Sequence, residues 1–319
     1  MDLYNTLKPL GRILDLSKEG WTVWDCSPVY GPDGRVHVFT SRWQNLDRPD
    51  LSWYRGSQII HSVADEPAGP YTICDIVIDA DGTGERHWDR WGVINPKIYD
   101  IRGRYYLLYT GCSEARLDAQ SVCLLAADSL NGPWEPLTDG PLIRPRPDRK
   151  GFDGFLCNNP AIALHPDGRY FLYYKGRNMS ENPDGKFPPG RMTIGLAIAD
   201  TISGPYHRHP SNPLIDMEPQ VEDPYVWHDG TVFRMIVETK PSGTDPAGWI
   251  MSSEDGIQWS DPEPGYPGTC RFLGRRQRLE EPNLLFKDDR PTHLFNVMGA
   301  CPEDPVYSGH VFEIISGKE

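Results

Sequence analysis

One short pattern recurs five times along this chain of 319 residues. Each copy has an acidic or amide residue near a proline, a short apolar segment, a turn, most often Asp-Gly, and a second apolar segment. The prolines of the five copies are 68, 64, 64 and 58 residues apart, at Pro28, Pro96, Pro160, Pro224 and Pro282. A recurrence this regular is the signature of a repeat architecture, in which each unit packs against its neighbours.

The first four copies are followed by a second pattern. A third apolar segment leads to a tight turn, usually Gly-Pro or Asp-Gly, and then to an aromatic residue, at Tyr71, Trp134, Tyr206 and Trp259. These turns suit antiparallel strands, so each unit reads as a four-stranded sheet. Five such units predict an all-β fold, a single-domain five-bladed β-propeller. Two stacked sandwiches of unrelated strands are the alternative, and the five matching copies argue against it.

The expected blades cover residues 21–78, 91–143, 155–214, 221–264 and 279–316, and residues 11–16 are expected to close the ring. The net charge of −13 and the absence of a basic run argue against a nucleic-acid partner. No apolar segment has transmembrane length, so no membrane contact is expected. The first residues lack a secretory pattern, which indicates a cytoplasmic protein, or a periplasmic or secreted one whose signal was removed. The oligomeric state stays open.

The seven cysteines show no metal-ligand spacing. Scattered cysteines in an odd number are most simply read as buried thiols in a reducing compartment.

Topology predicts where the functional residues meet. If the first strand of each blade starts at the centre, strand-one starts and strand-two ends gather at one mouth of the propeller. The strand-one starts contribute carboxyl and amide groups, namely Asp25, Asn95, Asn159, Glu222, Asp223, Glu280 and Glu281. The strand-two ends contribute Arg42, Trp43, Lys175, Arg177, Glu238 and Lys240. Long loops at 44–56, 79–91, 112–120, 144–157 and 178–191 should hang over the same mouth. A pocket is therefore expected there.

These repeated patterns resemble those of the five-bladed propeller glycoside hydrolases, meaning family 43 and relatives such as family 117. The resemblance covers nearly the whole chain as architecture. It implies a glycoside hydrolase, exo-acting and inverting, that releases a terminal sugar from a plant or algal oligosaccharide. Relatives often hold a structural Ca²⁺ in the central channel, although no ligand cluster in this sequence indicates one.

The resemblance to family 43 also implies three catalytic positions. An Asp at the start of blade one is the general base, an Asp at the start of blade three tunes the pKa of the acid, and a Glu two residues before the blade-four proline is the general acid. Glu222 matches the last position. Asp25 is the carboxylate at the start of blade one, but it lies three residues before Pro28 rather than next to it. Asn159 occupies the place of the tuning Asp, with Asp153 and Asp223 as stand-ins.

The chemistry also follows from the residues. Glycoside hydrolysis needs one protonated and one ionised carboxyl group, about 6.5–9.5 Å apart in an inverting enzyme so that a water fits between them. We expect Asp223 to raise the pKa of Glu222, as an acid requires. The simpler reading is that both carboxylates only form ion pairs or cap a turn.

The remaining candidates would bind the substrate. The cations Arg42, Lys175, Arg177 and Lys240 would either neutralise the mouth carboxylates or hold an anionic group of the sugar. Aromatic and polar side chains would contact sugar rings and hydroxyl groups, namely Trp43, His87, Trp88, Asn95, Asn159, Glu238 and Glu281. Three alternatives stay open: a polysaccharide lyase, a glycoside phosphorylase, and a carbohydrate-binding propeller without activity.

Overall fold

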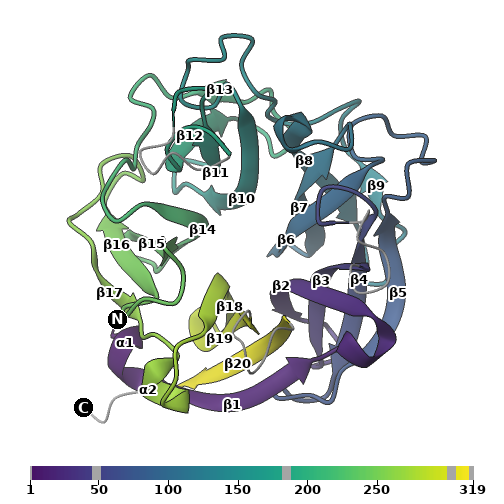
Figure 1. Cartoon of the computed structure of the whole chain (residues 1–319), viewed down its shortest axis with the longest axis vertical. Helices are drawn as coiled ribbons and strands as arrows, with labels where there is room; N and C mark the ends of the chain where they lie inside the picture. The colour runs from purple at the N-terminus through teal and green to yellow at the C-terminus, as the bar shows by residue number, and fades with distance from the viewer. Residues whose placement is uncertain (1, 45–51, 182–187, 300–306, 316–319) are drawn as a thin grey trace.

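The computed structural model describes residues 2–44, 52–181, 188–299 and 307–315. Five antiparallel sheets of four strands each stand around a common axis, as the sequence predicts (Figure 1). Blade one contains β2 (Trp21–Tyr30), β3 (Val36–Gln44), β4 (Ser57–Ala64) and β5 (Thr72–Asp79). Blade two contains β6 (Gly92–Ile101), β7 (Arg104–Cys112), β8 (Gln120–Ala127) and β9 (Glu135–Pro136). Blade three contains β10 (Leu156–Leu164), β11 (Tyr170–Arg177), β12 (Thr193–Ala199) and β13 (His207–Arg208).

Blade four contains β14 (Val221–His228), β15 (Phe233–Thr239), β16 (Gly248–Ser253) and β17 (Glu263–Tyr266). Blade five combines β18 (Arg278–Lys287), β19 (Arg290–Gly299) and β20 (Ser308–Ile314) with β1 (Leu7–Leu14), which pairs with β20 as the outermost strand. The ring is thus closed by a strand from the opposite end of the chain. The described helices are short: α1 (Leu3–Thr6), α2 (Cys270–Leu273), and the 3₁₀ turns Ser17–Glu19 and Leu117–Ala119. None of the described helices is long and apolar enough to cross a membrane.

The hydrophobic core lies between the blades. One buried cluster joins blades three and four through Phe171, Tyr173, Phe233 and Met235, and similar clusters fill the other four contacts between neighbours. Burial of apolar side chains between sheets stabilises at about 25 cal/mol per Å², so the ring as a whole holds each blade in place. Of the cysteines, Cys26, Cys112, Cys123 and Cys157 are buried free thiols, as expected from the sequence. Cys74 and Cys270 are exposed, which corrects that expectation for these two; Cys301 lies outside the described residues.

The innermost strands share an irregularity that sets the site. In each of them the pairing with the next strand skips two residues, for example between Ile94 and Lys97 and between Glu222 and Tyr225. The first skipped residue has a positive φ of 47° to 61° in all five blades, at Asp25, Asn95, Asn159, Asp223 and Glu281. Such backbone is uncommon outside glycine and is best tolerated by Asn and Asp.

The second skipped residue is a proline in four blades and Cys26 in blade one, where pairing skips from Trp24 to Ser27. The sequence alignment of blade one on Pro28 is therefore wrong. Asp25 directly precedes the structural counterpart of the other four prolines. It thus stands in the position that the family resemblance implies for a carboxylate of blade one.

Candidate active site

The five residues with positive φ meet at the propeller axis, and we call them the axial ring: Asp25, Asn95, Asn159, Asp223 and Glu281. Bulged backbone turns each side chain away from the strand ladder, and the side chains bond across blades. The Asn95 side chain donates from Nδ2 to Glu281 Oε1 at 2.8 Å, and the Asn159 side chain donates to the same oxygen at 3.0 Å. Asn159 Nδ2 also donates to Asp223 Oδ1. Asn95 Nδ2 likewise donates to Asp25 Oδ1 at 3.4 Å, so the two amides link three carboxyl groups of the ring.

Asp25 lies at the buried side of the axial ring and is fully enclosed. Its Oδ2 accepts hydrogen bonds from Ser41 Oγ at 3.0 Å and from the Asn95 backbone N–H at 2.9 Å. Burial raises the pKa of Asp25, and burial together with the charge of Asp25 raises the pKa of Glu281 well above its usual value. Asn95 Nδ2 donates to both carboxyl groups, which therefore lie close together. Two ionised carboxylates this close repel, which favours retention of a proton by the pair.

The buried ammonium group of Lys97 lies next to this pair. Lys97 has no exposed surface, and its Nζ donates to Asn283 Oδ1 at 2.9 Å and to the Pro282 carbonyl at 3.4 Å. It lies 4.0 Å from Glu281 Oε2. The positive charge near the axis is thus supplied by a side chain of the chain itself.

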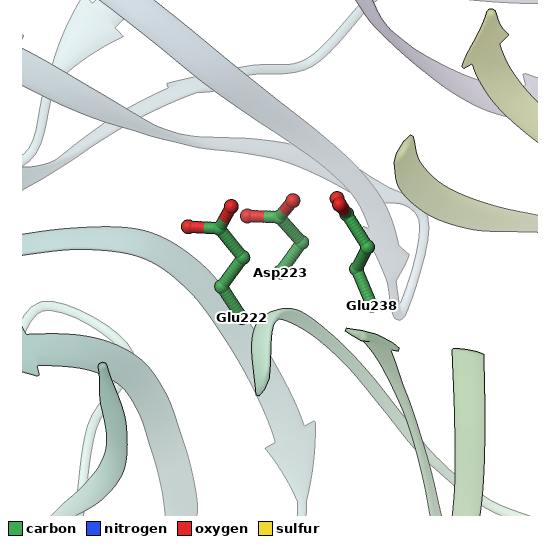
Figure 2. Close-up of side chains that lie close together, drawn as sticks. All are labelled: Glu222, Asp223 and Glu238. Carbon is green, nitrogen blue, oxygen red and sulfur yellow. The ribbon is translucent and has the colours of Figure 1, made fainter. Parts of the chain in front are cut away.

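A second carboxyl cluster lies on blade four. One oxygen each of Glu222, Asp223 and Glu238 falls within 4.8 Å of the others, and Figure 2 shows the three groups side by side. Ca²⁺ requires six to eight oxygen ligands. Here Lys240 already contacts Glu222 and lies 2.7 Å from Glu238 Oε1. With ammonium groups at both this cluster and the axial ring, these residues do not fit a resident Ca²⁺.

A cavity of about 430 Å³ opens over the axial ring. Its walls carry aromatic side chains, namely Trp24, Trp43, Trp53 and Tyr307. Cations and carboxyl groups share the rest of its surface with amides and a few apolar residues: Lys175, Arg177, Arg278, Glu222, Asp223 and Glu281. An apolar and aromatic pocket with a few convergent polar groups is the usual form of a small-ligand site.

Glu222 is the carboxylate of this cavity with the strongest ionic contacts. It forms ion pairs with Lys175 and Lys240. Burial pushes its pKa up, but the two ammonium groups outweigh burial and hold the pKa well below its usual range. The expectation that Asp223 raises the pKa of Glu222 is therefore wrong in its net sign, because the lysines dominate.

Asp223 shows the opposite shift. Burial, followed by the charges of Glu281 and Glu222, raises the pKa of Asp223 well above its usual value. The cavity therefore combines a carboxyl group whose pKa is lowered, Glu222, with two whose pKa values are raised, Asp223 and Glu281. Pairs of acids whose environments separate their pKa values in this way are typical of acid–base sites.

Most of the sequence-predicted residues gather here, but four lie away from the cavity wall, in addition to the enclosed Asp25. The Arg42 side chain donates to Gln58 Oε1 at 2.9 Å and covers the Trp21 ring at 4.1 Å. His87 is exposed, and Trp88 packs against the core between blades one and two. Glu238 is fully buried behind the wall, beneath Lys240.

Sequence reasoning missed three cavity residues and one axial lysine: Trp24, Arg278, Tyr307 and Lys97. Two of them carried a signal. Trp24 directly precedes Asp25, as Glu222 precedes Asp223, and Arg278 lies two residues before Glu280. Tyr307 lies outside the repeated patterns and carried none.

Comparison with known proteins finds no matching family model and no matching curated protein. Solved structures do match. Zg3597, a family 117 glycoside hydrolase from the marine bacterium Zobellia galactanivorans, has a TM-score of 0.74 and 16% identity, covering 98% of this chain and 91% of its own. A thermostable family-43 glycoside hydrolase has a TM-score of 0.62 and 14% identity, covering 92% and 88%. CoXyl43, a family-43 β-xylosidase/α-arabinofuranosidase from a compost metagenome solved with xylotriose, has a TM-score of 0.57 and 13% identity, covering 97% and 94%. The predicted likeness to this group of propellers is confirmed at the level of the fold.

Proposed function

We propose that the protein is a glycoside hydrolase that releases the terminal sugar of an oligosaccharide. The observation that carries the proposal is the cavity over the axial ring, where aromatic walls surround three carboxyl groups whose pKa values are shifted in opposite directions. Glycoside hydrolysis requires one protonated and one ionised carboxyl group, and opposite shifts favour that combination. The shared fold with families 43 and 117 supports the same reaction class.

The protonation states favour a revised division of roles. The lowered pKa of Glu222 favours the ionised form, which a base that activates water requires. The raised pKa values of Asp223 and Glu281 favour the protonated form, so one of them would donate a proton to the leaving oxygen. Asp25 is fully enclosed and acts as a positioning residue through Asn95, whose Nδ2 donates to both Asp25 and Glu281.

The shape of the cavity supports exo action. Four residues of the axial ring line the cavity, and Asp25 and Lys97 next to them are fully buried, so a sugar that enters from the mouth would meet the carboxyl groups with its terminal unit. Inversion requires a water between base and acid. Glu222 on blade four and Glu281 on blade five can flank a sugar from different blades, whereas Glu222 and Asp223 are neighbours in the chain.

The test is product analysis on oligosaccharides and aryl glycosides, including furanosides, anhydro-sugars and uronides. Wild type is compared with Glu222→Gln, Asp223→Asn and Glu281→Gln, and with Glu313→Gln as a surface control, because Glu313 forms a surface ion pair with the exposed Lys8. Loss of a catalytic base or acid lowers kcat by about 10²–10⁴-fold. We expect such a loss in Glu222→Gln and in one of the other two variants, and an inverted anomer in the first NMR spectra of the product.

Turnover by Glu222→Gln at the wild-type rate would refute the proposed site. An unsaturated product absorbing in the ultraviolet would identify a lyase instead, and dependence on added phosphate would identify a phosphorylase.

Two observations favour a second candidate, a carbohydrate-binding propeller without activity. Two lysines neutralise Glu222, and an amide, Asn159, stands where the resemblance implies an acid. Such a protein would bind sugars without turnover, and Glu222→Gln would bind them as well as wild type.

A further inference from the structure

The cations at the cavity differ in how their charge is balanced. Lys175 pairs with Glu222, Lys240 pairs with three carboxylates, and Arg278 lies 2.8 Å from Glu280 Oε1 through its Nε. These contacts match the simpler sequence reading, in which the mouth cations neutralise the mouth carboxylates. Arg177 is different, since no carboxylate lies within ion-pair distance of its guanidinium in the described part of the chain.

Arg177 is nevertheless buried. It ends β11, its side chain lines the cavity, and only 8% of its surface is exposed. Its Nη1 donates to the Pro188 carbonyl at 3.0 Å, and its other N–H groups have no acceptor among residues 2–44, 52–181, 188–299 and 307–315. A guanidinium has five N–H donors in a rigid fork. A desolvated charge is costly unless it is paired, and burial accordingly lowers the pKa of Arg177.

Glu222 does not supply the missing charge. Its charge acts to raise the pKa of Arg177, but it already contacts two ammonium groups with one carboxylate. Lys240 is also balanced by Glu238 and Glu280, so Lys175 and Arg177 are the two cations that share the charge of Glu222 at this side of the cavity. Lys175 and Arg177 are two residues apart on β11, and alternate residues of a strand point to the same face. Both line the cavity, so the excess positive charge faces the space where the sugar would bind.

We propose that Arg177 binds a carboxylate or sulfate group of the substrate, which makes the substrate an acidic sugar. This inference rests on the proposed function and specifies its substrate class. The planar fork of arginine matches either oxyanion with two parallel hydrogen bonds. The anionic group would lie beside Glu222, and the sugar ring would lie against the aromatic wall formed by Trp24, Trp43, Trp53 and Tyr307.

The test measures binding rather than turnover. D-galactose, D-galacturonate and D-galactose 6-sulfate are titrated by calorimetry into wild type, Arg177→Gln, Arg177→Lys and Arg42→Gln. The three sugars separate the neutral, carboxylate and sulfate cases. Arg42→Gln is the matched control, because Arg42 is also a partly buried cation near a strand-two end but contacts Gln58 and Trp21 outside the cavity. Thermal unfolding of each variant verifies that it is folded.

We expect one acidic sugar to bind wild type about 10- to 100-fold more tightly than galactose, the range for hydrogen bonds to a charged group. Arg177→Gln should abolish this preference while changing galactose affinity less than about twofold, and Arg177→Lys should restore part of it because a point charge lacks the fork. Arg42→Gln should retain the wild-type preference. Equal binding of all three sugars by wild type, or an unchanged preference in folded Arg177→Gln, would overturn the inference.

Failure of this inference is separable from failure of the proposed function. Glu222-dependent hydrolysis of a neutral substrate, without a preference for acidic sugars, would support the hydrolase function and refute the acidic substrate. Preference for an acidic sugar without hydrolysis of any substrate would support the acidic ligand and refute the hydrolase function.

Discussion

Lys240 is the structural centre of the blade-four carboxyl cluster, and its removal should destabilise the fold strongly. Its ammonium lies 2.7 Å from Glu238 Oε1 and 3.0 Å from Glu280 Oε1, contacts Glu222, and donates to Ser242 Oγ at 2.7 Å. Glu238 and Glu280 are fully buried, and the Lys240 side chain is 15% exposed. Removing one partner of a buried ion pair costs about 3–5 kcal/mol, because it leaves a buried charge unpaired.

Lys240→Met keeps most of the side-chain volume and removes the charge, so we expect a loss of about 3–5 kcal/mol in the free energy of unfolding at pH 7. For 319 residues the unfolding entropy is about 0.7 kcal/mol per kelvin, which converts the loss into a decrease of about 4–7 °C in Tm. Urea and thermal unfolding followed by tryptophan fluorescence measure both quantities. Lys8→Met is the control, since its pair with Glu313 is exposed and should be worth less than about 1 kcal/mol.

The effect should depend on pH with a definite sign. Burial pushes the pKa values of Glu222 and Glu280 up, but the neighbouring cations lower both in the folded protein. Their stabilising contribution is present above the unfolded pKa of about 4.3 and is lost as the pH falls towards their folded values. The gap between wild type and Lys240→Met should therefore narrow by up to about 1.4 kcal/mol per carboxylate for each pH unit below about 4.3. A loss under about 1 kcal/mol at pH 7, or a gap that stays constant on acidification, would refute this reasoning.

Three further predictions follow from the axial ring. Because Lys97 supplies the positive charge near the axis, a chelator or millimolar Ca²⁺ should leave the Tm of wild type unchanged. A Ca²⁺-dependent rise of several degrees in Tm would contradict the conclusion that these residues do not fit a resident Ca²⁺. Lys97→Met should lower stability by about 3–5 kcal/mol, measured by urea unfolding, and a neutral outcome would mean that the buried ammonium is not needed to balance Asp25 and Glu281. Asn159→Asp removes the amide that donates to both Asp223 and Glu281 and places another acid beside them. It should lower the free energy of unfolding by about 1–3 kcal/mol at pH 7 and by less at pH 5. Equal losses at the two pH values would argue against charge repulsion.

The sequence predicted the architecture because turn residues and apolar segments recur in every blade. It failed in the alignment of blade one, where a proline was used as the marker. The shared property of the five axial positions is a positive φ, and Asp25 has it although Cys26 follows instead of a proline. Backbone conformation of this kind has no unique sequence signal, since Asp, Asn and Glu all occupy it here.

The sequence predicted which residues form the candidate site better than it predicted their pKa shifts. Glu222 and Asp223 are neighbours in the chain, so their mutual effect could be anticipated. The two lysines that lower the pKa of Glu222 come from β11 on blade three and from the segment just after β15 on blade four. Their approach depends on how adjacent blades pack, which no local pattern records. The same limit applies to Arg177, whose lack of a carboxylate partner among the described residues is a property of the assembled cavity.

The pairing of β1 with β20 also decides how the ring would yield to mechanical force. Leu7 lies opposite Ile314, at the outer end of the pair, and Leu14 lies opposite Gly309 at the inner end. A pulling force applied between residues 7 and 314 therefore breaks the hydrogen bonds of this pair one after another rather than all at once. Blade five would peel apart at low force before the other four blades bear any tension, since each of those is built from strands that follow one another in the chain.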